Sequence, residues 1–536
     1  MQSILQRQRM RERFRDAHPE TLNGEARGRS KECPSTIVPF DVEKSKNVND
    51  ERIWAGLSTE FSPRNWSWSS KVFYTTCVGL TGLLVSGASA SNTEIVPQAA
   101  RQYLPSEIGP DGSATMRATQ IELMSITLYL AAFGMGTIVS GPLSETFGRN
   151  PVYITSLTIF GLFTLGSALS PNITSQLVCR FFMGLFGSPP NVTMGGSIAD
   201  MWTPAERTWI FPALSAMIFC GPFLSPVFAD LIATSEVLSW HSIEWITLIF
   251  TGIVLVLIVL FLPETYAPVL IRWQAEAFEG ITGQNASQAS QRTSTLRKRI
   301  SDNMRLPWLY LLHEPIVFSL SLYLVLIYSI LFGFLPGFTY IFGTAASRDY
   351  PHGIYGWSQK KSSLAFLPLS VGFLLSFLPL LWIYPRYKRK LARGTMTPEE
   401  RLLSALIGAP LLPASILWLG YTSRPETSVW SPLAANVLFG FASIMIFNSC
   451  YSYVIDAYEA KCSSALVGMT VTRYVAAAFM VHAAVPMYER LGVEKSLLWM
   501  GIVSAFPMGV VPFAFWKYGP VLRRRSRFGV WAEGDG

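Results

Sequence analysis

Apolar segments of about 20 residues, the length that spans a bilayer core, recur along this chain from residue 70 onward. They restrict the possible folds more than any other feature, because soluble domains interrupt such runs with charged residues. Only 15% of the residues are charged, against roughly 25% in soluble domains. We predict twelve membrane-spanning helices, at residues 71–91, 119–141, 152–169, 174–198, 208–232, 241–262, 314–342, 361–384, 400–420, 431–454, 463–486 and 495–516.

A polar stretch separates these segments into two groups of six, which predicts an all-α membrane protein made of two six-helix halves. Paired halves of this kind are typical of transporters whose site lies near the middle of the membrane. The predicted regions are a disordered cytoplasmic tail at 1–69, the first half at 70–262, a cytoplasmic linker at 263–312, the second half at 313–517 and a basic cytoplasmic tail at 518–536. The first tail is too poor in apolar residues to support a core.

Lys and Arg residues predict the orientation, because cytoplasmic loops of membrane proteins are enriched in them. With the N-terminus inside, the basic groups near residues 149, 207, 292–299, 386–393 and 523–527 all fall on the cytoplasmic side. Twelve spans then leave both termini in the cytoplasm. We expect the plasma membrane, with the vacuolar membrane as the alternative. Asn172, in the sequon NIT, falls in a short outer loop and is a candidate glycosylation site.

The stretch GPLSETFGRNP at 141–151 places an acid and a base in a short inner loop between apolar segments. Glu145 and Arg149 can pair with each other or with neighbouring helix ends, and Asp200 and Arg207 follow the fourth span at the same side. A charge cluster that forms in one conformation and breaks in another would act as a gate. The alternative is that these charges only fix the topology.

Among the charged residues within or at the edge of the predicted spans, four are singled out as candidates. Arg180 lies in the outer half of span four and Arg473 near the middle of span eleven, whereas Asp230 and Glu244 lie near outer helix ends. Charged groups in a bilayer are costly, so each is a functional candidate. A carboxyl group in a low-dielectric site can exchange a proton near neutral pH. Structural ion pairs are the alternative.

Four longer stretches carry a family resemblance: GPLSETFGRNPV, LVCRFFMGLFGSPPNVTMGGSIADMWTPAER, LFLPETYAPVLIRWQAE and FGFASIMIFNSCYSYVIDAYEAKCSSALVGMTVTRYVAAAF. The chain resembles the major facilitator superfamily and, more narrowly, the fungal drug:proton antiporters with twelve spans. The resemblance extends over residues 65–525.

The resemblance implies a secondary transporter that exports small organic molecules, such as drugs, toxins, polyamines or secondary metabolites, by proton antiport and alternating access. It implies a gate at Glu145, Arg149, Asp200 and Arg207 and proton coupling at Arg180, to which Asp230 and Glu244 are added as the unusual acids. The spans that line the central cavity in this superfamily carry the substrate candidates Tyr129, Tyr323, Tyr328, Asn448, Tyr451, Asp456 and Arg473.

Three departures from the family pattern keep other functions open. Asn150 stands where the family loop has a second base, the fifth span reads GPFLSPVFAD where glycines are usual, and WHSIEW precedes span six. An importer or facilitator of a small organic nutrient on the same fold is therefore an alternative, and so is a non-transporting receptor.

We expect no enzyme activity, because the chain has none of the G-x-S-x-G, H-E-x-x-H or P-loop patterns. The cysteines lack C-x-x-C spacing, so no metal site is expected. The expected partners are a small organic substrate and membrane lipid, with no nucleic acid. No cofactor is expected, since the proton gradient supplies the energy, and the protein is expected to be a monomer.

Overall fold

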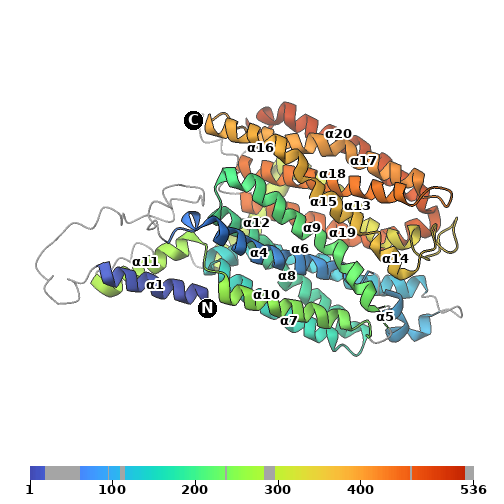
Figure 1. Cartoon of the computed structure of the whole chain (residues 1–536), viewed down its shortest axis with the longest axis horizontal. Helices are drawn as coiled ribbons and strands as arrows, with labels where there is room; N and C mark the ends of the chain where they lie inside the picture. The colour runs from blue at the N-terminus through green and yellow to red at the C-terminus, as the bar shows by residue number, and fades with distance from the viewer. Residues whose placement is uncertain are drawn as a thin grey trace, which may run out of the picture.

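The computed structural model describes residues 1–17, 61–93, 96–108, 115–233, 235, 238–282, 296–458 and 462–524, and these form a bundle of long helices (Figure 1). The first half contains η2 (Pro63–Asn65), α4 (Trp68–Ala90), α5 (Val96–Tyr103), η3 (Pro105–Glu107), α6 (Met116–Phe147), α7 (Arg149–Ala168), α8 (Ile173–Met201), α9 (Pro204–Ala233) and α10 (Ser242–Phe261). The second contains α13 (Pro315–Ile341), α14 (Gln359–Leu364), α15 (Leu367–Leu375), α16 (Phe377–Ala392), η5 (Pro398–Leu402), α17 (Leu403–Thr422), α18 (Trp430–Tyr458), α19 (Cys462–Leu491) and α20 (Val493–Arg524).

Eleven of these segments are long and apolar enough to cross a membrane. The remaining predicted span, α8, has 29 residues. It is less apolar because it contains Arg180 and the polar stretch Ser188–Asn191. It packs between α6 and α7 within the bundle, so it completes a set of twelve. The predicted all-helical fold of two six-helix halves is confirmed.

The eighth span, predicted as one helix at 361–384, consists of the three shorter helices α14, α15 and α16. The breaks fall at Ala365 and Ser376, shortly before Pro368 and Pro379. Proline has no backbone N–H to donate, and its ring clashes with the carbonyl of the preceding turn. The two prolines therefore account for the interrupted helix.

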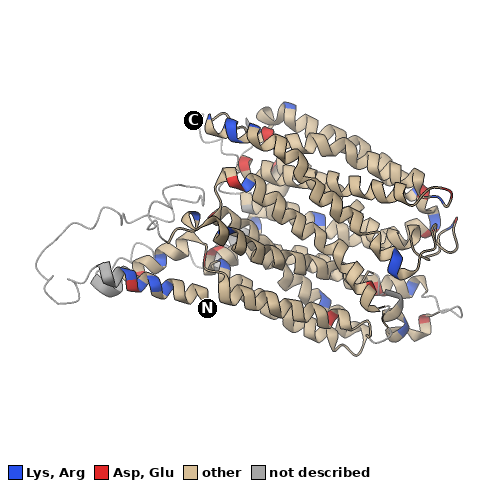
Figure 2. Cartoon of the chain, in the orientation of Figure 1, with Lys and Arg blue, Asp and Glu red and all other residues tan. Residues whose placement is uncertain are grey.

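Helices at the centre of the bundle are more buried than those at its two edges. In α13 and in α18, 67% of the residues in an apolar stretch of 18 residues are buried, against 28% in α10 and 33% in α20. The exposed face of α10 carries Ile246, Ile249, Ile253 and Val256, which is the surface expected of a helix that contacts lipid. Figure 2 shows that charged residues gather at the two ends of the bundle and are sparse between them.

The two termini of the described chain lie at the same end of the bundle. The ammonium group of Met1 donates to the carbonyl of Val259 at the end of α10, at 2.8 Å. Arg523 pairs with Glu399 in η5, and the neighbouring Arg401 reaches Thr208 at the start of α9. We call this the inner end, after the orientation that the charge distribution predicts, and the opposite end the outer end.

Parts of the predicted tails and linker are helical, which corrects the sequence-based expectation. The structure places α1 (Gln2–Ala17) in the segment expected to be disordered, and α11 (Ala267–Thr282) and α12 (Leu296–His313) in the linker. Arg7 of α1 pairs with Glu276 of α11 at 2.6 Å, so α1 is held by a partner far along the chain. Residues 18–60 lie outside the described residues, and α20 continues past residue 517 to Arg524.

Two glycines allow α6 and α8 to approach closely. A Cβ atom at Gly136 would collide with the Leu185 carbonyl of α8, and a Cβ atom at Gly184 would collide with the Tyr129 carbonyl of α6. Small residues serve this purpose in membrane helices, whose association depends on close packing. The contact joins α6, which carries the buried Glu122, to α8, which carries the buried Arg180 and Asp200.

Gly184→Ala is expected to destabilise the protein, because the new methyl group meets backbone that cannot move aside. Overpacking of this kind costs about 1–3 kcal/mol. Gly195→Ala in the same helix is the matched control, since a Cβ atom there meets nothing within 4 Å. Thermal unfolding of the purified proteins in detergent measures both. Equal midpoints for the two variants would contradict the close contact.

Candidate functional site

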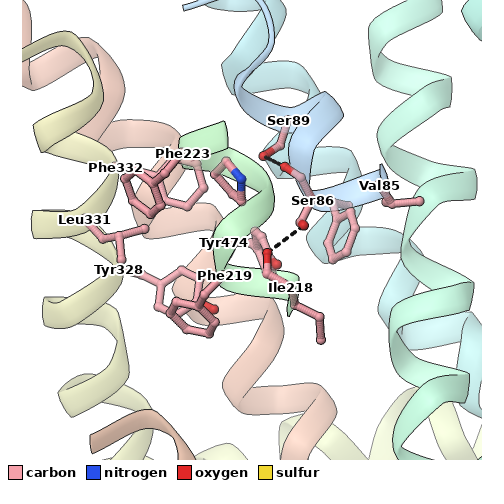
Figure 3. A pocket seen from close by; sticks show the side chains of 12 residues that line it. Val85, Ser86, Ser89, Ile218, Phe219, Phe223, Tyr328, Leu331, Phe332 and Tyr474 are labelled. Carbon is pink, nitrogen blue, oxygen red and sulfur yellow. Dashed lines mark hydrogen bonds between the residues drawn. The ribbon is translucent and has the colours of Figure 1, made fainter. Parts of the chain in front are cut away.

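A cavity lies between the two halves, near the middle of the bundle. It has α4, α6 and α9 on one side and α13 and α19 on the other. Its lining consists of Val85, Ser86, Ser89, Phe133, Ile218, Phe219, Pro222, Phe223, Tyr328, Leu331, Phe332 and Tyr474 (Figure 3). A mainly aromatic and aliphatic lining with a few hydroxyl groups is typical of sites that bind small organic molecules.

Aromatic side chains on one face of α9 seal this cavity from both ends. Phe219 lies 4.8 Å from Phe447 and 5.8 Å from Tyr328, measured between ring centroids. Closer to the outer end, Phe223 contacts the ring of Phe366 at 6.3 Å. Closer to the inner end, Phe211 stacks on Tyr451 at 6.3 Å. The contacts extend along the interface between the halves, so the structure has an occluded cavity.

Arg473 lies beside the cavity, on α19, inside a cage of four aromatic rings. Its guanidinium carbon is 4.6 Å from the ring centre of Tyr328, 5.0 Å from Phe447, 5.1 Å from Tyr451 and 5.2 Å from Tyr474. The residue is 6% exposed. Cation–π contacts of this kind stabilise a desolvated cation. The structure thus places Arg473 at the predicted cavity, together with Tyr328 and Tyr451.

The other predicted cavity residues of the second half differ in their positions. Asn448 lies next to Phe447, 8% exposed and with its side-chain oxygen unbonded. Tyr323 is buried on α13, and its hydroxyl group has no hydrogen-bond partner among the described residues. Asp456 lies at the inner end and pairs with Arg401 at 2.7 Å. This ion pair joins η5 to α18. Asp456 therefore does not line the cavity.

Tyr129 also lies away from the cavity. It is fully buried between α4, α6 and α8, and its hydroxyl group donates to the carbonyl of Val85 at 2.7 Å. The family resemblance implied that α6 lines the cavity, and the residue of α6 that does so is Phe133, one turn further along the helix. A single aromatic residue on a helix does not reveal which face is turned inward, and this explains the difference.

The outer part of the first half contains a buried ion pair between Arg180 and Glu244. Both side chains are 1% exposed, and the pair joins α8 to α10. Arg180 also donates to the Ala88 carbonyl at 2.8 Å, to Ser91 at 3.2 Å and to Asn92. The two residues predicted separately as proton-coupling candidates are thus direct partners. A proton on Glu244 would break the ion pair.

Two further acids lie buried at the outer end of the first half. Asp230 of α9 faces Ser363, Gln359 and Lys360 of α14, so it lies where the two halves meet. Glu122 of α6 is 2% exposed, with one carboxyl oxygen unbonded. Glu122 was missed by the sequence analysis, although an acid within an apolar span was a sufficient signal. Asp230 was predicted, but its contact with the other half was not.

At the inner end of the first half, Arg149 is enclosed by partners from three segments. Its Nε donates to Asp200 at 3.2 Å, and its Nη1 donates to Ser144 at 2.8 Å. The guanidinium group lies 4.7 Å from the ring of Tyr266. Asp200 is fully buried and also accepts from Thr265 at 3.4 Å. The structure therefore brings together Arg149 and Asp200, as the charge pattern indicated.

Glu264 organises this cluster from the segment that follows α10. Its carboxylate accepts from the backbone N–H groups of Arg149 at 2.9 Å and Asn150 at 3.2 Å, and so caps the start of α7. Burial raises the pKa of Glu264, and the backbone N–H groups that bond to it lower the pKa again in part. Gly148 has a φ of 98°, and a Cβ atom there would lie 2.5 Å from this carboxylate. Glycine is thus required at position 148, both for its positive φ and because a larger residue would collide with Glu264.

The remaining gate candidates lie around this cluster. Arg207 donates to the carbonyls of Trp202 at 3.0 Å and Ala199 at 2.8 Å, which satisfies the end of α8. Glu145 is half-buried and acts electrostatically on Arg149 and on Cys462 of the other half. It therefore lies at the inner boundary between the halves.

Asn172, the glycosylation candidate, is exposed at the outer end and caps α8. Its side-chain oxygen accepts from the backbone N–H of Ser175 at 2.9 Å. Its modification stays a prediction.

The family follows from a comparison with known proteins. The family model of the Major Facilitator Superfamily matches residues 74–481. The chain belongs to this superfamily, as its motifs indicated.

Among individual proteins, the chain is 41% identical over 480 residues to the MFS-type transporter kojT of Aspergillus flavus, covering 88% of this chain and 81% of that protein. It is 30% identical to the multidrug transporter mdrA of Aspergillus fumigatus, covering 92% and 78%. It is also 30% identical to mfs2 of Schizosaccharomyces pombe, an uncharacterized transporter, covering 90% and 87%. The protein is thus a membrane transporter by family.

Solved structures establish the fold independently. The xylose transporter XylE of E. coli, in a partially occluded inward-open conformation, matches with a TM-score of 0.58 at 16% identity, covering 84% of this chain and 98% of that one. The human organic anion transporter MFSD10 matches with a TM-score of 0.53 at 18% identity, covering 82% and 98%. At these identities the likeness concerns the fold alone.

Asp200→Asn is expected to destabilise the protein strongly, because it leaves Arg149 buried without its carboxylate. Removing one partner of a buried ion pair costs about 3–5 kcal/mol. The double variant Arg149→Gln with Asp200→Asn should recover part of this loss, and Glu426→Gln in an exposed outer loop is the control. Thermal unfolding in detergent gives the coupling between the two sites. Strictly additive effects would argue against the pair.

Proposed function

We propose that this protein exports small organic molecules through alternating access, driven by protons that enter the cell. The observation that carries the proposal is the occluded aromatic cavity between the halves, with the buried Arg180–Glu244 pair in the same half that forms one wall. The name of mdrA, a multidrug transporter at 30% identity, supports export of organic compounds. The plasma membrane, a monomeric state and the absence of a cofactor are part of the proposal.

Contacts between the halves at each end would serve as the gates. At the inner end, Arg401 of η5 donates to Thr208 of α9 at 3.1 Å. At the outer end, Gln120 of α6 donates to the His482 carbonyl of α19 at 3.4 Å, and Asp230 faces α14. These contacts are few and polar, so either set can separate at modest cost when the halves rock. The Arg149–Asp200 cluster keeps the inner end of the first half rigid during this movement.

Glu244 would carry the coupled proton. Protonation of its carboxyl group removes the charge that balances Arg180, which then keeps only the neutral acceptors on α4. A buried cation without its counter-charge is costly, so the protonated state would favour another arrangement of α4, α8 and α10. The helix α4 also lines the cavity with Ser86 and Ser89. Proton binding and substrate binding would therefore act on the same helix.

Import of a nutrient on the same fold is the second candidate, since the glycine pattern of the fifth span is altered. The cavity argues against a sugar-like substrate. Recognition of several hydroxyl groups requires a matching set of hydrogen-bond partners. Here the lining is mainly aromatic and aliphatic, and the Ser86 hydroxyl is already bonded to the Ile218 carbonyl at 2.7 Å.

Efflux from yeast that lacks its own drug pumps tests the direction and the coupling. Cells would be loaded with fluorescent dyes, fungicides and organic acids, and retention would be followed with and without a proton uncoupler. We expect faster loss of at least one compound and its suppression by the uncoupler. Uptake that rises with external acidity would support the importer instead.

Glu244→Gln should abolish the uncoupler-sensitive component of efflux while substrate exchange across the membrane continues. The amide imitates the protonated carboxyl group and cannot release a proton. Glu494→Gln, which removes a surface partner of Arg424, is the control and should behave as wild type. Surface expression is measured for every variant. Full proton-driven efflux by Glu244→Gln would exclude this residue as the coupling site.

A further inference from the structure

Arg473 differs from the other buried arginines that the structure describes, because no carboxylate pairs with it. Arg149 has Asp200, Arg180 has Glu244, and Arg523 has Glu399. Arg473 is as buried as these, yet no acid lies within 4 Å of it among the described residues. Two of its nitrogens, Nε and Nη1, also have no hydrogen-bond partner there.

A buried cation without a counter-charge is unfavourable, and aromatic rings compensate for it only in part. The four rings of the cage supply their faces, and the side chain of Tyr474 also forms a hydrogen bond with Arg473, but none of them supplies a negative charge. A protein that needed only a rigid contact at this point would be more stable with a neutral side chain of similar size. The charge at this position therefore indicates a binding site for an anionic ligand.

The cage is joined to the central cavity. Tyr328 and Tyr474, two of the four rings around Arg473, are also lining residues of the cavity (Figure 3). Phe219 of the opposite half packs on Tyr328 and on Phe447, another ring of the cage. The first half faces the cavity with serine hydroxyls and apolar side chains and contributes no charged group to the lining. The lining of the cavity is thus uncharged on the side of the first half. On the side of the second half, the Arg473 cation lies behind the rings of Tyr328 and Tyr474.

We propose that Arg473 is the counter-charge for the substrate, which is a small planar organic acid. Its anionic oxygen, from a carboxylate or an acidic enol, would accept from the free N–H groups of Arg473. Its ring would lie against the aromatic side chains of the cavity. The same charge would repel cationic compounds, so polyamines and cationic drugs are excluded. The inference rests on the proposed transport function.

Compounds that differ only in charge test this proposal. The panel consists of benzoate and 2-naphthoate, the corresponding neutral amides and the corresponding primary amines. Thermal unfolding of the purified full-length protein in detergent reports binding, and efflux from the yeast cells reports transport. We expect the acids to raise the unfolding midpoint and to be exported, and the amines to do neither.

The variant Arg473→Gln should lose the response to the acids, with apparent affinity weaker on the order of tenfold or more, as expected for a lost hydrogen bond to a charged group. Arg473→Lys should keep part of it, because the charge remains. Without any ligand, Arg473→Gln should unfold at the same temperature as wild type or higher, since it removes an uncompensated charge. Arg180→Gln, which breaks a pair, should unfold at a lower temperature. A purely structural role for Arg473 predicts that ligand-free Arg473→Gln unfolds at a lower temperature than wild type.

The outcomes separate this inference from the proposed function. Export of the amides or amines that persists in Arg473→Gln would overturn the inference and leave the transport function standing. A lower unfolding temperature of ligand-free Arg473→Gln, together with an unchanged response to the acids, would also overturn it. Failure of the folded wild-type protein to move any member of the panel or any dye or fungicide would overturn both.

Discussion

A charged group inside a bilayer has no water to bind, and the arrangement of this protein depends on how each such group is compensated. Arg180 is balanced by Glu244 across α8 and α10, and Arg149 is balanced by Asp200 at the inner end. These pairs tie together helices that close glycine contacts have already brought near each other. The first half is consequently a rigid unit, and the charges that hold it together are also the groups whose protonation would change it.

The two halves meet in a different way. Rings on α9 lie against rings of the second half along its length. Polar contacts between the halves lie at the two ends, and Thr127 of α6 also donates to the Ala478 carbonyl of α19 between them. Aromatic surfaces can slide and separate without leaving polar groups unbonded, which suits an interface that opens alternately at each end. The cavity lies where these rings leave space, so the same contacts that close the site also shape it.

Arg473 and the Arg180–Glu244 pair give each half one buried electrostatic feature. The second half contributes a cation enclosed by rings, and the first contributes a carboxyl group that is paired with a buried arginine. A substrate that carries a negative charge would bind to Arg473, and an entering proton would bind to Glu244. Substrate and proton would then act on opposite halves, and the shared helix α4 would connect them.

The sequence by itself determined the twelve spans, the two halves and the residues at which charge enters the membrane, because apolar length and isolated charges are local properties of the chain. It also indicated the Arg149–Asp200 cluster, since both residues flank short loops at the same end. Only the tertiary structure decided which partner each charge has. Glu244 reaches Arg180, and Glu264 caps α7, across separations of 64 and 115 residues. Tyr129 turns away from the cavity while Phe133 faces it. The rotation of each helix about its axis depends on the neighbours that pack against it, and that information is not local.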